Sequence, residues 1–244
     1  MPQRQPYHAE WPADRISAGV ADSITSATTR SGPREWLDEA LKRVLDLVLA
    51  SLLLIVLAPV MAVIAIAIRC TSPGPALFHQ TRIGYRLSPF VMLKFRTMQV
   101  DNDDSIHRAY ATAILSGEAT PAEAERGVYK LTRDPRVTSV GAFLRRSSLD
   151  ELPQLFNVLR GDMSLVGPRP VLPYEVELFE PRFHARFLAK PGITGLWQVS
   201  GRSTLPMRQA LQLDVDYVQR RTIGLDILTL LRTVPAVLRG HEAA

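Results

Sequence analysis

Residues 44–68 read VLDLVLASLLLIVLAPVMAVIAIAI, and the only charge in this stretch is that of Asp46. With a rise of about 1.5 Å per residue, a helix of this length could cross a hydrocarbon core about 30 Å thick. A helix so long and so uniformly apolar is uncommon in the core of a soluble protein. The stretch therefore predicts a helix that enters a membrane.

Pro59 lies inside this predicted helix. Proline removes one backbone hydrogen bond and clashes with the preceding turn, so we expect the helix to kink or break there, which leaves each half short for a crossing. Basic residues flank both ends, Lys42 and Arg43 before and Arg69 after, and they give no bias between inside and outside. Two arrangements stay open: a helix–break–helix that returns to the same face, and a proline-kinked span.

The chain divides into three predicted parts. Residues 1–35 have the composition of a disordered tail, residues 36–69 form the membrane segment with Trp36 at its boundary, and residues 70–240 form a domain. Within that domain, the acidic and alanine-rich stretch at 101–127 predicts a helix N-terminus.

The domain is expected to be α+β and mostly helical. Its hydrophobic patterns predict short strands at 76–79 and 90–95 and helices at 174–188, 207–221 and 224–238. The last of these helices is too short to span a membrane. It could lie in the membrane interface or pack on the domain.

Positive charge is concentrated in one region of the chain. The 244 residues carry a net charge of +5, and residues 126–170 hold eight basic and four acidic side chains, a net +4. Such a patch indicates a polyanionic partner, which could be a nucleic acid, a nucleotide, a phospholipid or another phosphate.

The single cysteine, Cys70, excludes an intrachain disulfide framework. The sequence also lacks the motifs of Rossmann, P-loop, zincin and hydrolase-elbow sites.

A pair of carboxylates lies inside this basic region, in the stretch RRSSLDELPQL at 145–155. Ser148 and Glu151 have the spacing of a capping box, which predicts that a helix starts here. Asp150 would then lie at the positive end of the helix dipole, where a phosphate could bind. The alternative is that Asp150 and Glu151 only cap this helix and pair with Arg145 and Arg146.

Two further motifs present cationic groups. In Gly167-Pro168-Arg169-Pro170, the two prolines would hold the arginine rigidly, and its planar guanidinium suits bidentate phosphate binding. A surface turn is the alternative. Lys94 and Arg96, in Lys94-Phe95-Arg96-Thr97-Met98, could face lipid headgroups or a phosphate, or belong to a solvated loop. A β-like run between glycines at 190–202 could line a pocket with backbone groups.

Taken in order, these segments resemble the bacterial sugar transferases, which are monotopic phosphoglycosyl transferases. The resemblance covers about residues 36–240, and Ala58-Pro59 stands where many members have Ser-Pro. The segments that carry it are the Pro-interrupted apolar helix at 42–69, Lys94 to Met98, Arg145 to Leu155, Gly161-Asp162-Met163-Ser164, Gly167 to Pro170, and Lys190-Pro191-Gly192-Ile193-Thr194-Gly195.

The resemblance implies a re-entrant membrane helix and a catalytic domain at the cytoplasmic face of the bacterial inner membrane. It implies transfer of hexose-1-phosphate from a UDP-hexose, with galactose or glucose favoured, to undecaprenyl phosphate, with release of UMP. This would be the first membrane step of exopolysaccharide assembly. The implied cofactor is Mg²⁺, and the implied partners are the two substrates and membrane lipid, with no nucleic acid. A homodimer stays open.

The resemblance also implies residue roles. Asp150 would be the nucleophile, and an aspartate is ionised at neutral pH and available for that task. Glu151 would assist, with metal or with a proton at the acceptor, and Asp150 is also the candidate metal ligand. Arg145 and Arg169 would neutralise phosphate charge. The predicted substrate-binding set is completed by Pro168, Lys94 and Arg96.

Two other classes of protein are compatible with part of this sequence. A membrane-anchored module that binds an anionic ligand would explain the basic patch and the apolar helix, but carboxylates inside the patch would weaken such binding. A catalytically idle scaffold of a polysaccharide complex is the other class, and the intact set of Asp150, Glu151, Arg145 and Arg169 argues against it.

Overall fold

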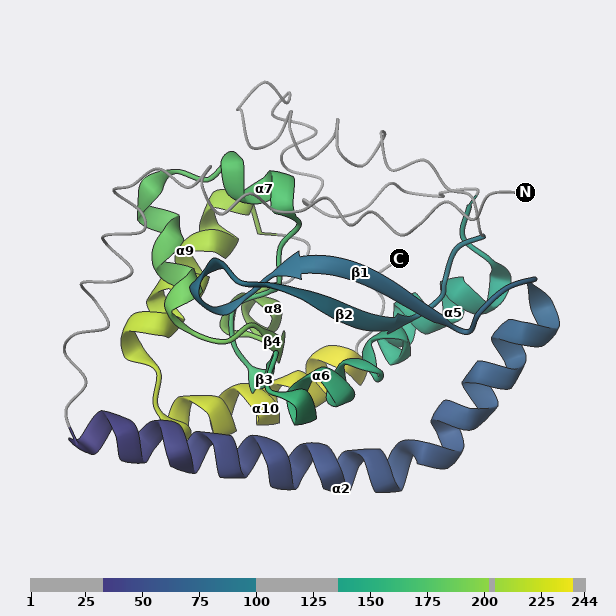
Figure 1. The fold of residues 1–244 in the computed structure, drawn as a ribbon, viewed down its shortest axis with the longest axis horizontal. Coiled ribbons are helices and arrows are strands. Elements are labelled where there is room, and N and C mark those ends of the chain that lie inside the picture. The colour runs from purple at the N-terminus through teal and green to yellow at the C-terminus, as the bar shows by residue number, and fades with distance from the viewer. Residues whose placement is uncertain (1–32, 100–135, 202–204, 239–244) are drawn as a thin grey trace.

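The computed structural model describes residues 33–99, 136–201 and 205–238 (Figure 1). The prediction for the stretch at 101–127 lies outside these residues, and so does that for the tail at 1–35 except for its last three residues, which are helical. The described part is mostly helical and contains two small sheets of two strands each. This agrees with the predicted α+β class.

The longest element is helix α2 (Pro33–Thr71), which has 39 residues and contains Pro59. Figure 1 shows α2 running along the base of the rest of the chain and then turning up beside α5. The helix is therefore bent and does not break into two pieces. A proline is the usual cause of such a bend, because its ring displaces the preceding turn without ending the helix.

The apolar part of α2 is not a core helix. It is long and apolar enough to cross a membrane, and only 11% of its most apolar window is buried against the rest of the protein. Large apolar side chains project outward along its length, with Ile55 75% exposed and Val63 66% exposed. This exposure fits an element whose surroundings are lipid.

Both ends of α2 rest against the same compact body. Toward its start, Lys42 donates to the carbonyl of Val166, and near the midpoint Ala50 is fully buried in a core cluster with Val158. Near its end, Ile64 and Ile68 pack in another cluster with Phe95 and Leu144. The exposed stretch around Ile55 and Val56 therefore lies between two parts of α2 that pack on one domain.

An antiparallel hairpin of β1 (Leu77–Ile83) and β2 (Pro89–Phe95) confirms the two predicted strands. Between the strands lies the short 3₁₀ turn η2 (Tyr85–Leu87). Gln80 is opposite Met92, and Arg82 is opposite Phe90. Because residues opposite one another share a face, Arg82, Met92 and Lys94 all project to one side of the hairpin.

The second sheet joins β3 (Ser164–Val166) and β4 (Gly192–Thr194) in parallel. Glycines let the two segments meet backbone to backbone. A Cβ atom added to Gly192 would lie 2.1 Å from the nitrogen of Gly167, and one added to Gly167 would lie 2.3 Å from the carbonyl oxygen of Lys190. The Gly-Pro-Arg-Pro and Lys-Pro-Gly-Ile-Thr-Gly motifs are thus two halves of one packed unit.

The other helices surround these sheets. They are α5 (Ser139–Ser147), η3 (Leu149–Glu151), α6 (Gln154–Arg160), α7 (Pro173–Glu177), η4 (Pro181–Leu188), α8 (Leu196–Ser200), α9 (Met207–Arg220) and α10 (Ile223–Leu238). The predictions for α9 and α10 are confirmed. The single helix predicted at 174–188 is instead the short α7 followed by the 3₁₀ helix η4, because Pro181 starts a new element.

Helix α10 packs on the domain through Leu225 and Leu230, which join the cluster around Ala50. Its opposite side leaves Leu231 66% exposed and Val234 59% exposed. Figure 1 shows α10 lying just above the first part of α2.

Candidate active site

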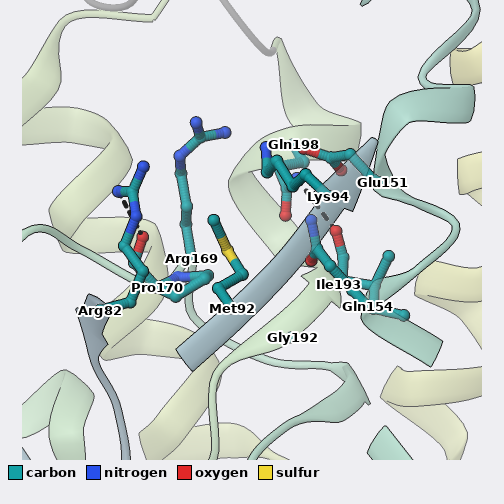
Figure 2. Close-up of a pocket in the computed structure, with 10 residues that line it drawn as sticks. All are labelled: Arg82, Met92, Lys94, Glu151, Gln154, Arg169, Pro170, Gly192, Ile193 and Gln198. Atoms are coloured by element: carbon teal, nitrogen blue, oxygen red, sulfur yellow. Dashed lines mark hydrogen bonds and ion pairs between the residues drawn. The ribbon is translucent and has the colours of Figure 1, made fainter. Parts of the chain in front are cut away.

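A pocket opens between the β-hairpin, the η3–α6 segment and the β3–β4 unit (Figure 2). Three predicted site residues, Lys94, Glu151 and Arg169, meet there although they lie far apart in the sequence. The full lining is Arg82, Met92, Lys94, Glu151, Gln154, Arg169, Pro170, Gly192, Ile193 and Gln198.

The carboxylate pair lies in the 3₁₀ turn η3, between α5 and α6. Ser148 does not form the predicted capping box with Glu151. It ends α5 in the left-handed conformation, with φ of 57°, and makes no side-chain cap hydrogen bond. The next α-helix begins only at Gln154. The prediction failed because residues 139–147 are already helical, so that Ser148 turns the chain between two helices.

Glu151 forms an ion pair with Lys94 of β2, with 2.9 Å between Oε1 and Nζ. This contact between two elements differs from the alternative prediction that Glu151 pairs with Arg145 and Arg146. Burial raises the pKa of Asp150 to about 6, and the negative charge of Glu151 adds to this. The charges of Lys94 and Arg145 oppose the rise. At neutral pH the Asp150 carboxylate is therefore mainly ionised.

The segment that carries Arg169 is fixed along its backbone. Gly167 donates its N–H to the carbonyl of Thr194 at 2.9 Å, and Gly192 donates to the carbonyl of Pro168 at 2.9 Å. Pro168 is buried and shapes this backbone without lining the pocket. Arg169 itself is only partly buried, and its side chain extends beside Met92 in Figure 2.

A buried ion pair stands behind Arg169. Arg186 donates from Nη2 to the carbonyl of Arg169 at 2.7 Å and pairs with Asp214 at 2.5 Å. Burial raises the pKa of Asp214 to about 6, against the opposing charge of Arg186. On the other side, the guanidinium carbon of Arg169 lies 5.9 Å from the centroid of the Trp197 ring, within cation–π range.

Arg96 has another place in the structure. Its guanidinium donates to the carbonyl oxygens of Ser72 and Pro73, in the turn that follows α2, and to the Ser72 hydroxyl. The side chain is buried, which lowers its pKa, and it does not line the pocket. These contacts give Arg96 a structural role, and substrate contact by Arg96 stays a prediction.

Several lining residues were not singled out from the sequence. Arg82 donates to the carbonyl of Pro170 at 3.2 Å and to Gln80 at 2.7 Å, and its place follows from a hairpin register that the sequence does not reveal. Gln198 belongs to the run at 190–202 that was predicted to line a pocket, but it projects from α8, because the β-like run ends at Thr194. Its Nε2 donates to the carbonyl of Ile193 at 3.3 Å.

Among the described residues, no group of three or more His, Cys, Asp or Glu side chains could by itself hold a metal. Asp150 and Glu151 nevertheless supply two adjacent carboxylates. Mg²⁺ is commonly held by one or two carboxylates, with substrate phosphates and water completing its coordination. The donor set therefore fits Mg²⁺ that arrives with a phosphorylated substrate.

Most of the chain matches one known family. The family model described as bacterial sugar transferase matches residues 37–240. This chain belongs to the bacterial sugar transferase family. Within that family, a protein of Caulobacter vibrioides named UDP-glucose:undecaprenyl-phosphate glucose-1-phosphate transferase is 45% identical over 210 residues, which cover 83% of this chain and 71% of that relative.

Two further relatives match at similar levels. The exopolysaccharide production protein ExoY of Rhizobium meliloti is 39% identical over 196 residues, with 80% of this chain and 84% of ExoY covered. An undecaprenyl-phosphate galactose phosphotransferase of Salmonella typhimurium is 41% identical over 203 residues, with 83% of this chain and 41% of the relative covered. The matched part of that relative is thus less than half of its length.

Proposed function

We propose that this sugar transferase moves a hexose-1-phosphate from a UDP-hexose to undecaprenyl phosphate and releases UMP. The observation that carries the proposal is the meeting of Lys94, Glu151 and Arg169 in one pocket, with Asp150 next to Glu151 in the same turn. The names of the relatives support both substrates. Glucose and galactose occur in different names, so UDP-glucose and UDP-galactose are both candidate donors.

In the first step, an oxygen of the Asp150 carboxylate attacks the phosphorus that bears the sugar. The bond from that phosphorus to the bridging oxygen breaks, and UMP leaves with that oxygen. The sugar phosphate is then held as an acyl phosphate on Asp150. Arg169 and Lys94 neutralise negative charge on the diphosphate, because phosphoryl transfer depends mainly on positioning and electrostatic stabilisation.

In the second step, an oxygen of the lipid phosphate attacks the same phosphorus. The bond to Asp150 breaks, the carboxylate is restored, and the lipid diphosphate sugar leaves. Glu151 lies beside the reacting carboxylate and is held by Lys94, so it is placed to orient the incoming phosphate or a metal ion. Mg²⁺, held by Asp150 and Glu151 together with substrate phosphate, would supply further charge neutralisation.

The proposed membrane arrangement is re-entrant, at the cytoplasmic face of the bacterial inner membrane. A straight crossing would separate the two ends of α2 by about the 30 Å of a hydrocarbon core. Instead, Lys42 toward one end and Ile68 near the other both contact the same domain. The bend in α2 supports an apolar middle that dips into lipid and returns. Such a helix would hold the pocket at the depth of the lipid phosphate.

The direct test is UMP release by the purified protein with Mg²⁺, a panel of UDP-sugars and undecaprenyl phosphate. We expect UMP release from UDP-glucose or UDP-galactose. Continued release over many turnovers should require undecaprenyl phosphate. Intact-mass measurement without acceptor should detect a sugar phosphate on the wild-type protein and none on Asp150→Asn. Asp216→Asn is the matched control, since Asp216 lies on α9 and contacts Gln212. UMP release by Asp150→Asn at the wild-type rate would rule out the covalent step.

A further inference from the structure

Asp46 is a charged residue inside an apolar membrane helix, and the transfer chemistry does not use it. It is only 5% exposed, and its Oδ1 accepts a hydrogen bond from the backbone N–H of Leu165 at 3.1 Å. Lys42, one turn earlier on the same face of α2, donates to the carbonyl of Val166 at 3.2 Å and pairs with Asp226 at 2.5 Å. Both residues therefore hold strand β3, which leads directly into Gly167-Pro168-Arg169.

Arg43 holds the other side of the site. It donates from Nη1 to the carbonyl of Val158 at 2.7 Å and from Nη2 to the carbonyl of Leu159 at 3.0 Å. These carbonyls lie in the last turn of α6, whose first residue is the pocket residue Gln154. A short polar stretch of α2 thus grips both the element that presents Arg169 and the helix that follows Glu151.

Membrane anchoring alone does not require these contacts. Leucine at position 46 would serve insertion better, because a buried carboxylate is costly unless it is hydrogen-bonded or paired. The partners are also specific, since they are backbone groups of the segments that converge on the pocket. The contacts therefore couple the seating of α2 to the geometry of the site.

We propose that Lys42, Arg43 and Asp46 are positioning residues that set the placement of Arg169 relative to the Asp150–Glu151 pair. The membrane helix then serves as a structural part of the active site as well as an anchor. The expected effect on the reaction rate rests on the proposed function. The expected effect on the structure rests only on the hydrogen bonds of β3. A misplacement of about 1 Å can cost about 10²-fold in rate, so the kinetic effect should be measurable.

The test compares variants of the full-length protein in lipid nanodiscs. Asp46→Leu removes the acceptor for the Leu165 N–H, whereas Asp46→Asn keeps an amide oxygen that can accept it. Arg69→Leu is the matched control, because Arg69 is an exposed charge in the last turn of the same helix. If Asp46→Leu does not fold, Lys42→Met takes its place, with Lys42→Arg as the conservative variant.

The structural readout is hydrogen exchange of the peptide that contains residues 164–170, which requires no activity. We expect exchange of this peptide to be at least about tenfold faster in Asp46→Leu than in wild type, and close to wild type in Asp46→Asn and Arg69→Leu. Unchanged exchange in Asp46→Leu would overturn the inference, whether or not the protein releases UMP. Absence of UMP release by wild type would instead count against the proposed function.

The kinetic readout is UMP release with varied UDP-hexose. We expect Asp46→Leu to lower kcat at least about tenfold with a KM change of less than about threefold, and Asp46→Asn to restore most of the rate. In an Arg169→Ala background, Asp46→Leu should cost less than about twofold, because the guanidinium that it displaces is already gone. An equal loss in both backgrounds would show that Asp46 does not act through Arg169 and would overturn the inference.

Discussion

The two segments that supply charge to the pocket are built in different ways. In the segment from Leu165 to Pro170, the backbone groups form hydrogen bonds with four other elements, α2, β1, β4 and η4. The partners include Asp46, Thr194, Gly192, Arg186 and Arg82. The backbone-to-backbone hydrogen bonds of the Asp150–Glu151 turn are short-range, such as the N–H of Glu151 to the carbonyl of Ser148 at 3.2 Å. The turn is also held by the ion pair with Lys94 and by packing of Leu149 and Leu152.

The difference follows the work of each segment in the proposed reaction. The arginine segment only neutralises charge, so it can be fixed before substrate arrives, and fixed charges need no reorganisation in the transition state. The carboxylate segment forms and breaks a bond to phosphorus, and its environment must also tune a pKa. Four predictions test this contrast, from the largest expected effect to the smallest.

Gly192→Ala should damage the rigid segment most. The added Cβ would lie 2.1 Å from the nitrogen of Gly167 and 2.4 Å from the carbonyl oxygen of Thr194, and backbone atoms cannot move aside as a flexible side chain can. We expect a loss of about 3 kcal/mol in the free energy of unfolding, the upper end of the usual cost of overpacking, and loss of activity. Gly224→Ala is the control, because the nearest atom to its Cβ is 3.8 Å away. Thermal unfolding in detergent compares the stability of the two variants, and equal melting temperatures for Gly192→Ala and Gly224→Ala would contradict the backbone-to-backbone packing.

Arg169→Ala should leave the fold intact and lower kcat by about 10²-fold, the usual cost of removing one donor that stabilises transition-state charge. Arg169→Lys should recover only part of this, because lysine keeps the charge and loses the planar fork. Arg208→Ala is the control, since Arg208 is 70% exposed and pairs with Glu180 on the surface. The measurement is the initial rate of UMP release. A wild-type kcat in Arg169→Ala would show that Arg169 does not stabilise the transition state.

Lys94→Met should shift the pH profile of UMP release. The reaction requires ionised Asp150, whose pKa is about 6, so the rate falls as the pH drops through that value. Lys94 is the strongest influence that lowers this pKa, and its removal raises the pKa, which moves the acidic limb to higher pH. Arg145→Met should produce a smaller shift in the same direction. An acidic limb that moves to lower pH in Lys94→Met would contradict this electrostatic account.

Arg96→Gln should have the smallest effect on the reaction. The variant loses charge-assisted hydrogen bonds to the turn after α2, so we expect the melting temperature to fall by several degrees. The KM for UDP-hexose should stay within about twofold of wild type. Arg208→Gln is the exposed control. A raised KM with an unchanged melting temperature would instead support the substrate contact predicted from the sequence.

Sequence patterns predicted the elements whose structure depends on neighbouring residues. The apolar length of α2, the strands on either side of Gly84 and the periodicity of α9 are local signals, and the structure agrees with them. The sequence also named Lys94, Glu151 and Arg169, which the pocket brings together. The cap at Ser148 was wrong, because a capping box is a local pattern that a preceding helix can override.

The rest depends on contacts between distant segments. The spacing of Lys42 and Asp46 shows only that they share a helix face, and their partners Val166 and Leu165 are more than a hundred residues away. The position of Arg82 in the pocket depends on hairpin register, and that of Arg96 on the turn after α2. Such placements follow from tertiary structure, and the residue type alone does not predict them.

The contacts at the start of α2 also bear on how the protein is made. A ribosome completes α2 long before the domain exists, and Asp46 precedes Leu165 by 119 residues, while Lys42 precedes Asp226 by 184. During that interval Lys42 and Asp46 of the nascent helix lack the partners that they have in the folded protein. The ion pair of Lys42 with Asp226 can close only after translation has reached α10. Assembly of the site is therefore a late event in biogenesis, and a chain interrupted before α10 would lack the Asp226 partner of Lys42.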